Sequence, residues 1–125
     1  MKTRIITIII GAALLIGAGF FFINRSSEPA TVAVTEQTII LDVRTPAEFA
    51  EGHLEGAELL DLNGGQLSAA ISTMDQDAQY FVYCRSGNRS AQAVQLMKDA
   101  GFTDVTDLGS LDQAASATGL TKNRS

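Results

Sequence analysis

The sequence has little of the residues that small domains use for covalent or metal-based stabilisation. Its 125 residues include one cysteine, one histidine and no tryptophan. A single cysteine excludes an intramolecular disulfide, which leaves an intermolecular pair or a free, reactive thiol. The lone His53 is not a metal site by itself, so no metal is predicted. Repeats and low-complexity tracts are also lacking, and the 46% hydrophobic content indicates a globular body with one small core.

Positive charge is scarce beyond the N-terminus. All 14 acidic residues but only six of the nine basic residues lie after Ser27, which gives this part a net charge of −8. Such a surface repels nucleic acid and anionic lipid head groups, so no nucleic-acid partner is predicted. Arg85 and Arg89 nevertheless lie within five residues of Cys84. This local positive charge favours a small anionic ligand, and the alternative is a solvated turn that carries two arginines by chance.

The N-terminus carries the one long hydrophobic run. Lys2 and Arg4 precede 19 residues without a charge, Ile5 to Ile23. At about 1.5 Å per residue such a helix just spans a hydrocarbon core of about 30 Å, so we expect an uncleaved membrane anchor. A signal peptide cleaved after the small residues 17–19 is the alternative. The basic residues before the run predict a cytoplasmic N-terminus. The rest of the chain is then periplasmic or otherwise extracytoplasmic, anchored to the inner (plasma) membrane or released after cleavage.

Strand and helix patterns alternate along the rest of the chain. Residues 38–43 (TIILDV), 79–84 (QYFVYC) and 103–108 (TDVTDL) are short runs rich in β-branched and apolar side chains, typical of buried strands. Helices are predicted from Pro46 to about Glu51, over 66–74, over 89–100, and from Ser110 toward Thr118. This alternation predicts an α/β domain with a mostly parallel central sheet flanked by helices.

Local signals fix the ends of these helices. Thr45 as N-cap, Pro46 at the first position and Glu48 three residues after the cap form a capping-box pattern, and Gly52 is a stop signal. Gly101 is the corresponding stop for the helix over 89–100. The spacing within that helix predicts a buried face made of Ala91, Val94 and Met97.

The position of Cys84 indicates its role. It ends a predicted strand just before a helix, where open α/β sheets bind their ligands. The following residues Arg85 to Asn88 tolerate a tight turn, so successive backbone N–H groups can face inward around an anion. These groups, the start of the next helix and the two arginines all favour the thiolate, so we expect an activated nucleophile. The alternative is a buried cysteine that acts as a small hydrophobic residue.

Two reaction classes use such a thiolate: sulfur transfer and phosphate-ester hydrolysis. Cysteine-dependent phosphatases place an arginine six positions after the cysteine. Here the sixth position is Ser90, and Arg89 stands at the fifth. The loop is one residue too short to surround a phosphate, which favours a persulfide sulfur.

The sequence resembles a single-domain rhodanese-like sulfurtransferase. The segment DVRTPAEFAEGHLEGA, Asp42 to Ala57, matches one motif of that family, and VYCRSGNRS, Val82 to Ser90, matches its cysteine loop. The later AGFTDVTDLGSLD parallels the family's tail, with Gly109-Ser110 in place of a glycine pair. Within the family the short exported members of the phage-shock-protein-E type are the most similar. We therefore assign residues 1–26 to the anchor or signal peptide, 27–37 to a linker with a possible first strand at Thr31 to Val34, and 38–125 to the rhodanese-like domain.

The resemblance implies a two-step sulfur transfer. Cys84 would take the outer sulfur of a small anionic donor such as thiosulfate as a persulfide and pass it to a thiol or to cyanide. The loop Arg85, Ser86, Gly87, Asn88 and Arg89 would bind the donor, and no metal or organic cofactor is implied. A persulfide or redox relay that acts with a protein partner, and a small phosphatase or arsenate-handling enzyme, remain alternatives. The sequence predicts no particular oligomeric state.

Three further residues are expected to support the loop. Asp42 and Arg44 follow the first strand, and a structural ion pair is the expected arrangement, with a catalytic role as the alternative. His53 is expected as a hydrogen-bonded turn residue, with a general base as the alternative. Glu48 is explained by the capping box alone.

Overall fold

The computed structural model describes residues 31–124. The predicted anchor or signal segment, Ile5 to Ile23, lies outside the described residues. Within residues 31–124, no helix combines the length and the apolar character that a membrane crossing requires.

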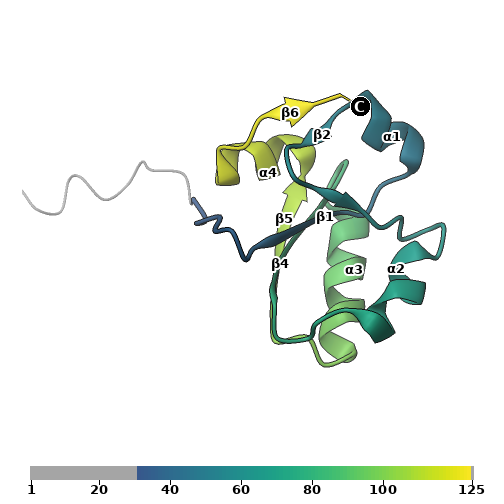
Figure 1. Cartoon of the computed structure of the whole chain (residues 1–125). Helices are drawn as coiled ribbons and strands as arrows, with labels where there is room; N and C mark the ends of the chain where they lie inside the picture. Colours follow the sequence, from purple (N-terminus) through teal and green to yellow (C-terminus); the bar gives the residue numbers. More distant parts are fainter. Residues whose placement is uncertain (1–30, 125) are drawn as a thin grey trace, which may run out of the picture. The chain divides into compact units, whose positions relative to one another are not determined.

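A four-stranded parallel sheet forms the centre of the domain. Its order is β3 (Glu58–Leu59), β1 (Ile39–Asp42), β4 (Gln79–Cys84) and β5 (Asp104–Ser110). A separate antiparallel pair joins β2 (His53–Leu54) to β6 (Lys122–Asn123), and Figure 1 shows β6 alongside β2. The mostly parallel sheet predicted from the alternating pattern is therefore confirmed. Strands β1 and β4 are central, adjacent and parallel, so their carboxyl ends lie next to each other.

Two of the four α-helices within residues 31–124 begin at a capping box. The helices are α1 (Pro46–Glu51), α2 (Gln66–Ala70) with a 3₁₀ extension η2 (Ile71–Thr73), α3 (Asn88–Asp99) and α4 (Leu111–Thr118). Thr45 and Glu48 form the predicted capping box of α1, and Ser110 forms a second one with Gln113 at α4. Each box satisfies N–H groups that the first helical turn leaves without a partner.

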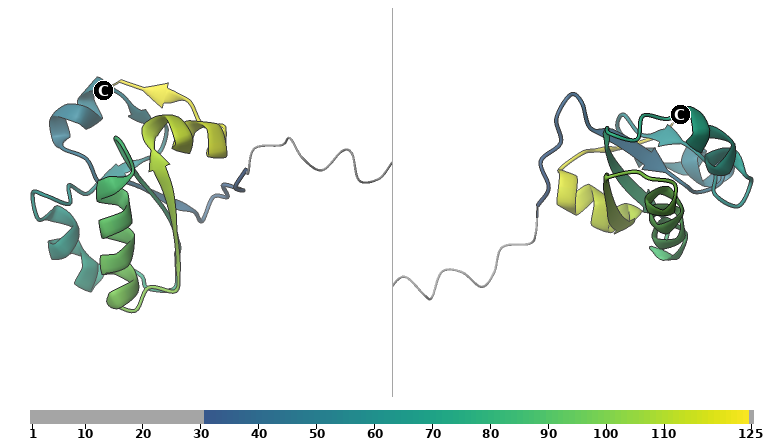
Figure 2. Two further views of the ribbon diagram at one scale, coloured as in Figure 1. Left: turned by 180° about the vertical axis from the view of Figure 1, so that it is seen from behind. Right: turned by 90° about the horizontal axis from the view of Figure 1, so that it is seen from below.

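Hydrophobic side chains pack on both faces of the sheet. On one face, Val82 and Cys84 of β4 pack with the buried side of α3 and with Leu67 of α2. On the other, Phe81 and Tyr83 pack with Leu54 and with the buried side of α4. Figure 2 shows α3 and α4 on the two sides of the strands. Because side chains alternate along a strand, β4 contributes to both cores and is buried along nearly its whole length.

Two expectations need correction, and one open question is answered. The possible first strand is absent: residues Thr31 to Val34 form no strand, the Val32 N–H donates to the Ala117 carbonyl at 3.0 Å, and Val32 packs on the α4 side of the sheet. The buried face of α3 consists of Ser90, Ala93, Val94 and Met97, whereas Ala91 is exposed. The helix predicted over 66–74 narrows to a 3₁₀ turn after Ala70.

Candidate active site

Cys84 is the last residue of β4, and its side chain is 0% exposed. The pairing of β4 with β5 shifts register between Val82 and Tyr83, so Cys84 lies opposite Ser110. The sulfur is thus held at the carboxyl end of a central strand, directly below the loop that leads into α3. The strand fixes the position of the thiol, and the loop determines its surroundings.

Backbone N–H groups of this loop converge on the sulfur. The Gly87 N–H donates to Sγ at 2.9 Å, and the N–H groups of Ser86 and Ser90 also act on the thiol. Gly87 has φ +96°, a conformation that disfavours residues with a Cβ, and it directly precedes α3. The inward-facing N–H groups expected from the sequence are therefore present.

Two opposing effects act on the acidity of Cys84. Burial by itself raises the pKa of the thiol, because the charged form loses its hydration. Hydrogen bonds from the Ser90 side chain and from the N–H groups of Ser90, Gly87 and Ser86 stabilise the thiolate, and together they lower the pKa below its ordinary value. The net lowering of the pKa agrees with the expectation of an activated thiol.

Ser90 is a site residue that sequence reasoning missed. Its side chain is fully buried, and its Oγ lies 3.5 Å from Sγ, in an orientation that lets the thiol donate to it. The same hydroxyl can donate to the carbonyl oxygens of Gly87 at 3.1 Å and Gly109 at 3.4 Å. A hydroxyl has one proton, so it can turn from these carbonyls to the sulfur when the thiol ionises. The sequence held one hint of this contact: Ser90 falls in the first turn of the helix that follows the cysteine loop, only six positions after Cys84.

Arg89 does not present its guanidinium to the sulfur loop as a free charge. Its Nη1 and Nη2 donate to the two carboxylate oxygens of Glu48 at 2.7 and 3.0 Å. The hydrogen bond from Arg89 is the main reason that the pKa of Glu48 falls to about 2, so this carboxylate stays ionised. The sequence assigned Glu48 to the capping box only. The structure adds an ion pair that joins α1 to the start of α3.

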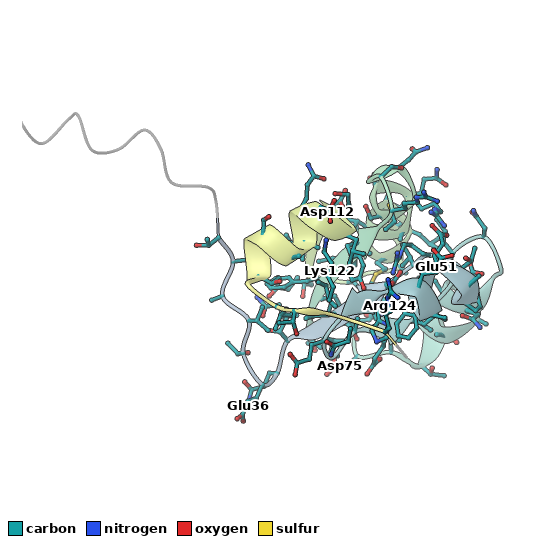
Figure 3. The ribbon with its side chains drawn as sticks, turned by 90° about the horizontal axis from the view of Figure 1, so that it is seen from above. Glu36, Glu51, Asp75, Asp112, Lys122 and Arg124 are labelled. Carbon is teal, nitrogen blue, oxygen red and sulfur yellow. The ribbon has the colours of Figure 1, made fainter. Side chains whose placement is uncertain are left out.

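Arg85, Ser86 and Asn88 are exposed on the outer side of the loop. Arg85 opens onto a cavity of about 270 Å³ whose other walls are Arg44, Glu48, Glu51, Leu111 and Asp112. A second cavity of about 340 Å³ shares four of these residues and extends to Lys122 and Arg124. Figure 3 shows Lys122 next to Asp112 and Arg124 on the side of Glu51. The accessible space near the cysteine loop therefore has walls of mixed charge.

Asp42 and Arg44 form a buried ion pair beneath the loop. Arg44 Nε and Nη2 donate to the Asp42 carboxylate at 2.9 and 2.6 Å, and Nη2 also donates to the Gly52 carbonyl at 2.6 Å. The Tyr83 hydroxyl donates to Asp42 at 2.9 Å and accepts from the Leu54 N–H at 3.0 Å. Burial raises the pKa of Tyr83, so its hydroxyl remains a donor. Every oxygen of Asp42 is bonded, which is the arrangement of a structural network.

His53 lies in β2 beside α1. Its Nδ1 is 2.8 Å from the Phe49 carbonyl oxygen, and its ring stacks on Phe49 with centroids 3.7 Å apart. These contacts hold the ring at the end of α1. None of its contacts in the described residues is with Cys84.

Comparisons with known proteins agree with this architecture. A family model described as Rhodanese-like domain matches residues 29–115. The thiosulfate sulfurtransferase PspE of Escherichia coli K12 is 31% identical over 75 residues, which are 60% of this chain and 72% of that protein. A solved structure described as a rhodanese with anions from E. coli has a TM-score of 0.61 and 27% identity, and the match covers 70% of this chain and 99% of that one.

Other relatives are much longer than this chain. The probable adenylyltransferase/sulfurtransferase MoeZ of Mycobacterium tuberculosis is 36% identical over 72 residues, which are 55% of this chain but only 18% of that protein. The chain therefore corresponds to a small part of such proteins, so the activity of those whole proteins is not transferred to it.

Proposed function

The chain belongs to the rhodanese-like domain family, and from this premise we propose that it is a sulfurtransferase that carries sulfur on Cys84. The donor is thiosulfate or a similar small anion with a sulfane sulfur, and the acceptor is a thiol or cyanide. The observation that supports this most directly is the thiol itself. Its sulfur receives the Gly87 N–H at 2.9 Å, and hydrogen bonds lower its pKa despite full burial.

The first step loads the cysteine. The Cys84 thiolate attacks the outer sulfur of thiosulfate, a new S–S bond forms, and the bond to the inner sulfur breaks. Sulfite leaves with the electron pair of that bond, and the negative charge of the thiolate passes to the outer sulfur of the persulfide. The N–H groups of Ser86, Gly87 and Ser90 point at this region and stabilise the anion.

The second step transfers the outer sulfur from Cys84 to the acceptor. A thiolate or cyanide attacks the outer sulfur, and the bond between the two sulfurs breaks. The product is an acceptor persulfide or thiocyanate, and the thiolate of Cys84 is restored. Donor and acceptor therefore react in turn, as in ping-pong kinetics.

Mass spectrometry of the intact, full-length chain in mild detergent tests this proposal. After incubation with thiosulfate, we expect the mass to rise by one sulfur atom, with the added atom on Cys84, and to return to its original value after cyanide is added. The variant Cys84→Ser should show no adduct. Sulfur transfer that persists in this variant would exclude the proposal.

The same experiment separates the two alternatives. An adduct that forms only from a partner protein's persulfide, and never from thiosulfate, would indicate a relay module. Hydrolysis of phosphate esters without any sulfur adduct would indicate a phosphatase. The loop with Arg89 at the fifth position after Cys84 argues against this last outcome.

We further propose that the domain acts outside the cytoplasm, at the inner membrane. The basis is the sequence alone: an uncharged run from Ile5 to Ile23 behind two basic residues. The protein should be recovered in the membrane fraction at full length. A shorter mature form in the soluble periplasmic fraction would indicate signal cleavage, and recovery from the cytoplasm would contradict both versions.

A further inference from the structure

Glu48 is held in one place by more contacts than a capping box requires. Its two oxygens accept from the Arg89 guanidinium at 2.7 and 3.0 Å. One of them also accepts from the Thr45 N–H at 3.3 Å and from the Thr45 hydroxyl at 3.2 Å. Less than a fifth of either side chain in the ion pair is exposed. This carboxylate is therefore a fixed charge beside the cysteine loop.

The position of Glu48 changes the charge that an incoming donor meets. Glu48 and Glu51 line both cavities, and the smaller cavity also reaches Arg85 of the cysteine loop. Among residues 31–124, Arg89 and Arg44 are each paired with a carboxylate, whereas Arg85 is in no ion pair. Of the two arginines near Cys84, only Arg85 is therefore unpaired, and it shares its cavity with the carboxylates of Glu48, Glu51 and Asp112. The second cavity adds Arg124, which is also in no ion pair within residues 31–124. The sequence alone suggested two available arginines.

We propose that Glu48 determines how much negative charge a sulfur donor can carry. It keeps Arg89 directed away from the donor and adds its own negative charge, so that a singly charged donor is favoured over a doubly charged one. This inference rests on the proposed sulfurtransferase function and specifies its substrate class. Glu48 acts through Arg89 and through its field, so it is a positioning residue.

The substitution Glu48→Gln removes the negative charge while keeping the hydrogen bonds that begin α1, so it separates the effect of charge from an effect on folding. Glutamine replaces glutamate at the third position of capping boxes, so α1 keeps its start. The amide oxygen can still accept from Arg89, but the full ion pair is lost and the guanidinium gains freedom to turn toward the cavity. A unit charge removed from the wall of the cavity changes the affinity for a donor in proportion to the donor's own charge.

Two donors of similar shape and different charge make this measurable. Thiosulfate carries two negative charges. Methanethiosulfonate has a methyl group in place of one charged oxygen and carries one. Both give their outer sulfur to the Cys84 thiolate; the S–S bond breaks, and sulfite or methanesulfinate leaves with its electron pair. The KM and kcat for each donor are measured on the full-length protein, with cyanide as acceptor.

The wild-type protein should have the lower KM for methanethiosulfonate. In Glu48→Gln the KM for thiosulfate should fall about three- to tenfold, with a smaller fall for methanethiosulfonate and little change in kcat. The difference should shrink as salt is added, because exposed charges are screened. Glu36→Gln is the charge-matched control: it removes the same charge from the turn before β1, which Figure 3 shows far from Glu51, and should leave the ratio of the two KM values unchanged.

The outcomes are distinct. If Cys84 is loaded by both donors and the variant leaves their KM ratio within twofold of the wild type, this inference is wrong and the sulfurtransferase function stands. If neither donor loads Cys84, the proposed function fails, and this inference with it. Thermal unfolding shows whether the variant is folded. If the variant does not fold, the KM values of the wild-type protein for the two donors test the inference by themselves. A wild-type KM that is lower for thiosulfate than for methanethiosulfonate then overturns it.

Discussion

At the scale of single residues, the acidity of Cys84 connects the structure to reactivity. Its pKa is lowered because hydrogen bonds to the thiolate outweigh the effect of burial. The alkylation rate of Cys84 by iodoacetamide should therefore reach half its maximum at a pH below about 8.5, the ordinary value for a cysteine. The rate is followed by mass spectrometry across pH. A midpoint at or above the ordinary value would contradict the hydrogen-bond geometry.

The same shift has a consequence for stability. A group whose pKa is lower in the folded state than in the unfolded one stabilises the fold at pH values above its unfolded pKa. This contribution is lost as the pH falls through the folded pKa. Cys84 thus makes the fold more stable on the alkaline side of neutrality, and Cys84→Ser should remove that part of the pH dependence.

Within residues 31–124, Ser90 is the one side chain that hydrogen-bonds with the Cys84 sulfur: the thiol donates to its Oγ, and the hydroxyl can turn to donate to the thiolate. Ser90→Ala should raise the pKa of Cys84, so that alkylation below the midpoint slows by about three- to tenfold, while the rate at high pH changes little. Ser68→Ala, on the exposed side of α2, is the matched control and should not move the midpoint. An unchanged midpoint in Ser90→Ala would show that the backbone N–H groups suffice.

Sequence reasoning identified Cys84 because its signal is local: a strand, a turn and a helix in succession. It missed Ser90 and the second role of Glu48. A hydroxyl that turns toward a sulfur, and a carboxylate that pairs with an arginine 41 positions away, depend on contacts between elements. For Ser90 the short spacing from Cys84 was a weak local signal, whereas no local spacing encodes a pair 41 positions apart.

At the scale of elements, the pair of Glu48 and Arg89 joins α1 to α3. The folded-state pKa of Glu48 is about 2, below its ordinary value, chiefly because of the hydrogen bond from Arg89. Its stabilising effect is therefore present above about pH 4.3, the ordinary pKa of glutamate, and is lost as the pH falls toward the folded value. Wild type should exceed Glu48→Gln by about 2 kcal/mol in free energy of unfolding near pH 6.

That difference should shrink to a small remainder near about pH 2, where half of the Glu48 carboxyls are protonated in the folded state, and should vanish below that pH. Urea unfolding at several pH values measures it. A difference that stays constant across this range would mean that glutamine fails for steric reasons, and that the charge of Glu48 contributes nothing.

Capping residues made several elements predictable. The boxes that begin α1 and α4 use residues three positions apart, so they can be read directly from the chain. The two-residue strands β2, β3 and β6 could not be predicted, because two residues show no alternation. The sequence left open whether Thr31 to Val34 form a first strand; the chain there contacts α4 and joins no sheet.

At the scale of the whole molecule, the buried network around Asp42 joins segments that are distant in the chain. It links β1 to β4 through Tyr83 and to the end of α1 through Arg44 and the Gly52 carbonyl. Asp42→Ala should lower the free energy of unfolding by about 3–5 kcal/mol, because it leaves the buried Arg44 without its partner. Tyr83→Phe removes neutral and charge-assisted hydrogen bonds and should cost about 1–3 kcal/mol.

Denaturant unfolding of the two variants measures these effects. If both variants lose the same free energy of unfolding, the hydrogen bonds of the Tyr83 hydroxyl contribute most of the stabilisation of this network. A loss below about 1 kcal/mol for Asp42→Ala would mean that water reaches Arg44 and replaces the carboxylate.

The class of fold was predictable at this scale, whereas the exact assembly was not. Alternating strands and helices were enough to indicate a parallel sheet, and the β4 segment was evidently buried on both faces. The pairing of β6 with β2, and the larger cavity beside α1, arise from the return of the C-terminal residues to His53 and Leu54. Such long-range contacts become visible only in three dimensions.

The complete enclosure of the Cys84 sulfur also decides which way a loaded intermediate can react. A thiol that attacks the inner sulfur of a persulfide would release hydrosulfide and leave a mixed disulfide on the protein. That attack must reach Sγ in line with the S–S bond, from the side opposite the outer atom, whereas loading uses the side on which the outer atom arrives. Sγ is buried and contacts Ser90 and the Gly87 N–H, so we expect acceptors to attack the outer atom and mixed disulfides on Cys84 to be rare.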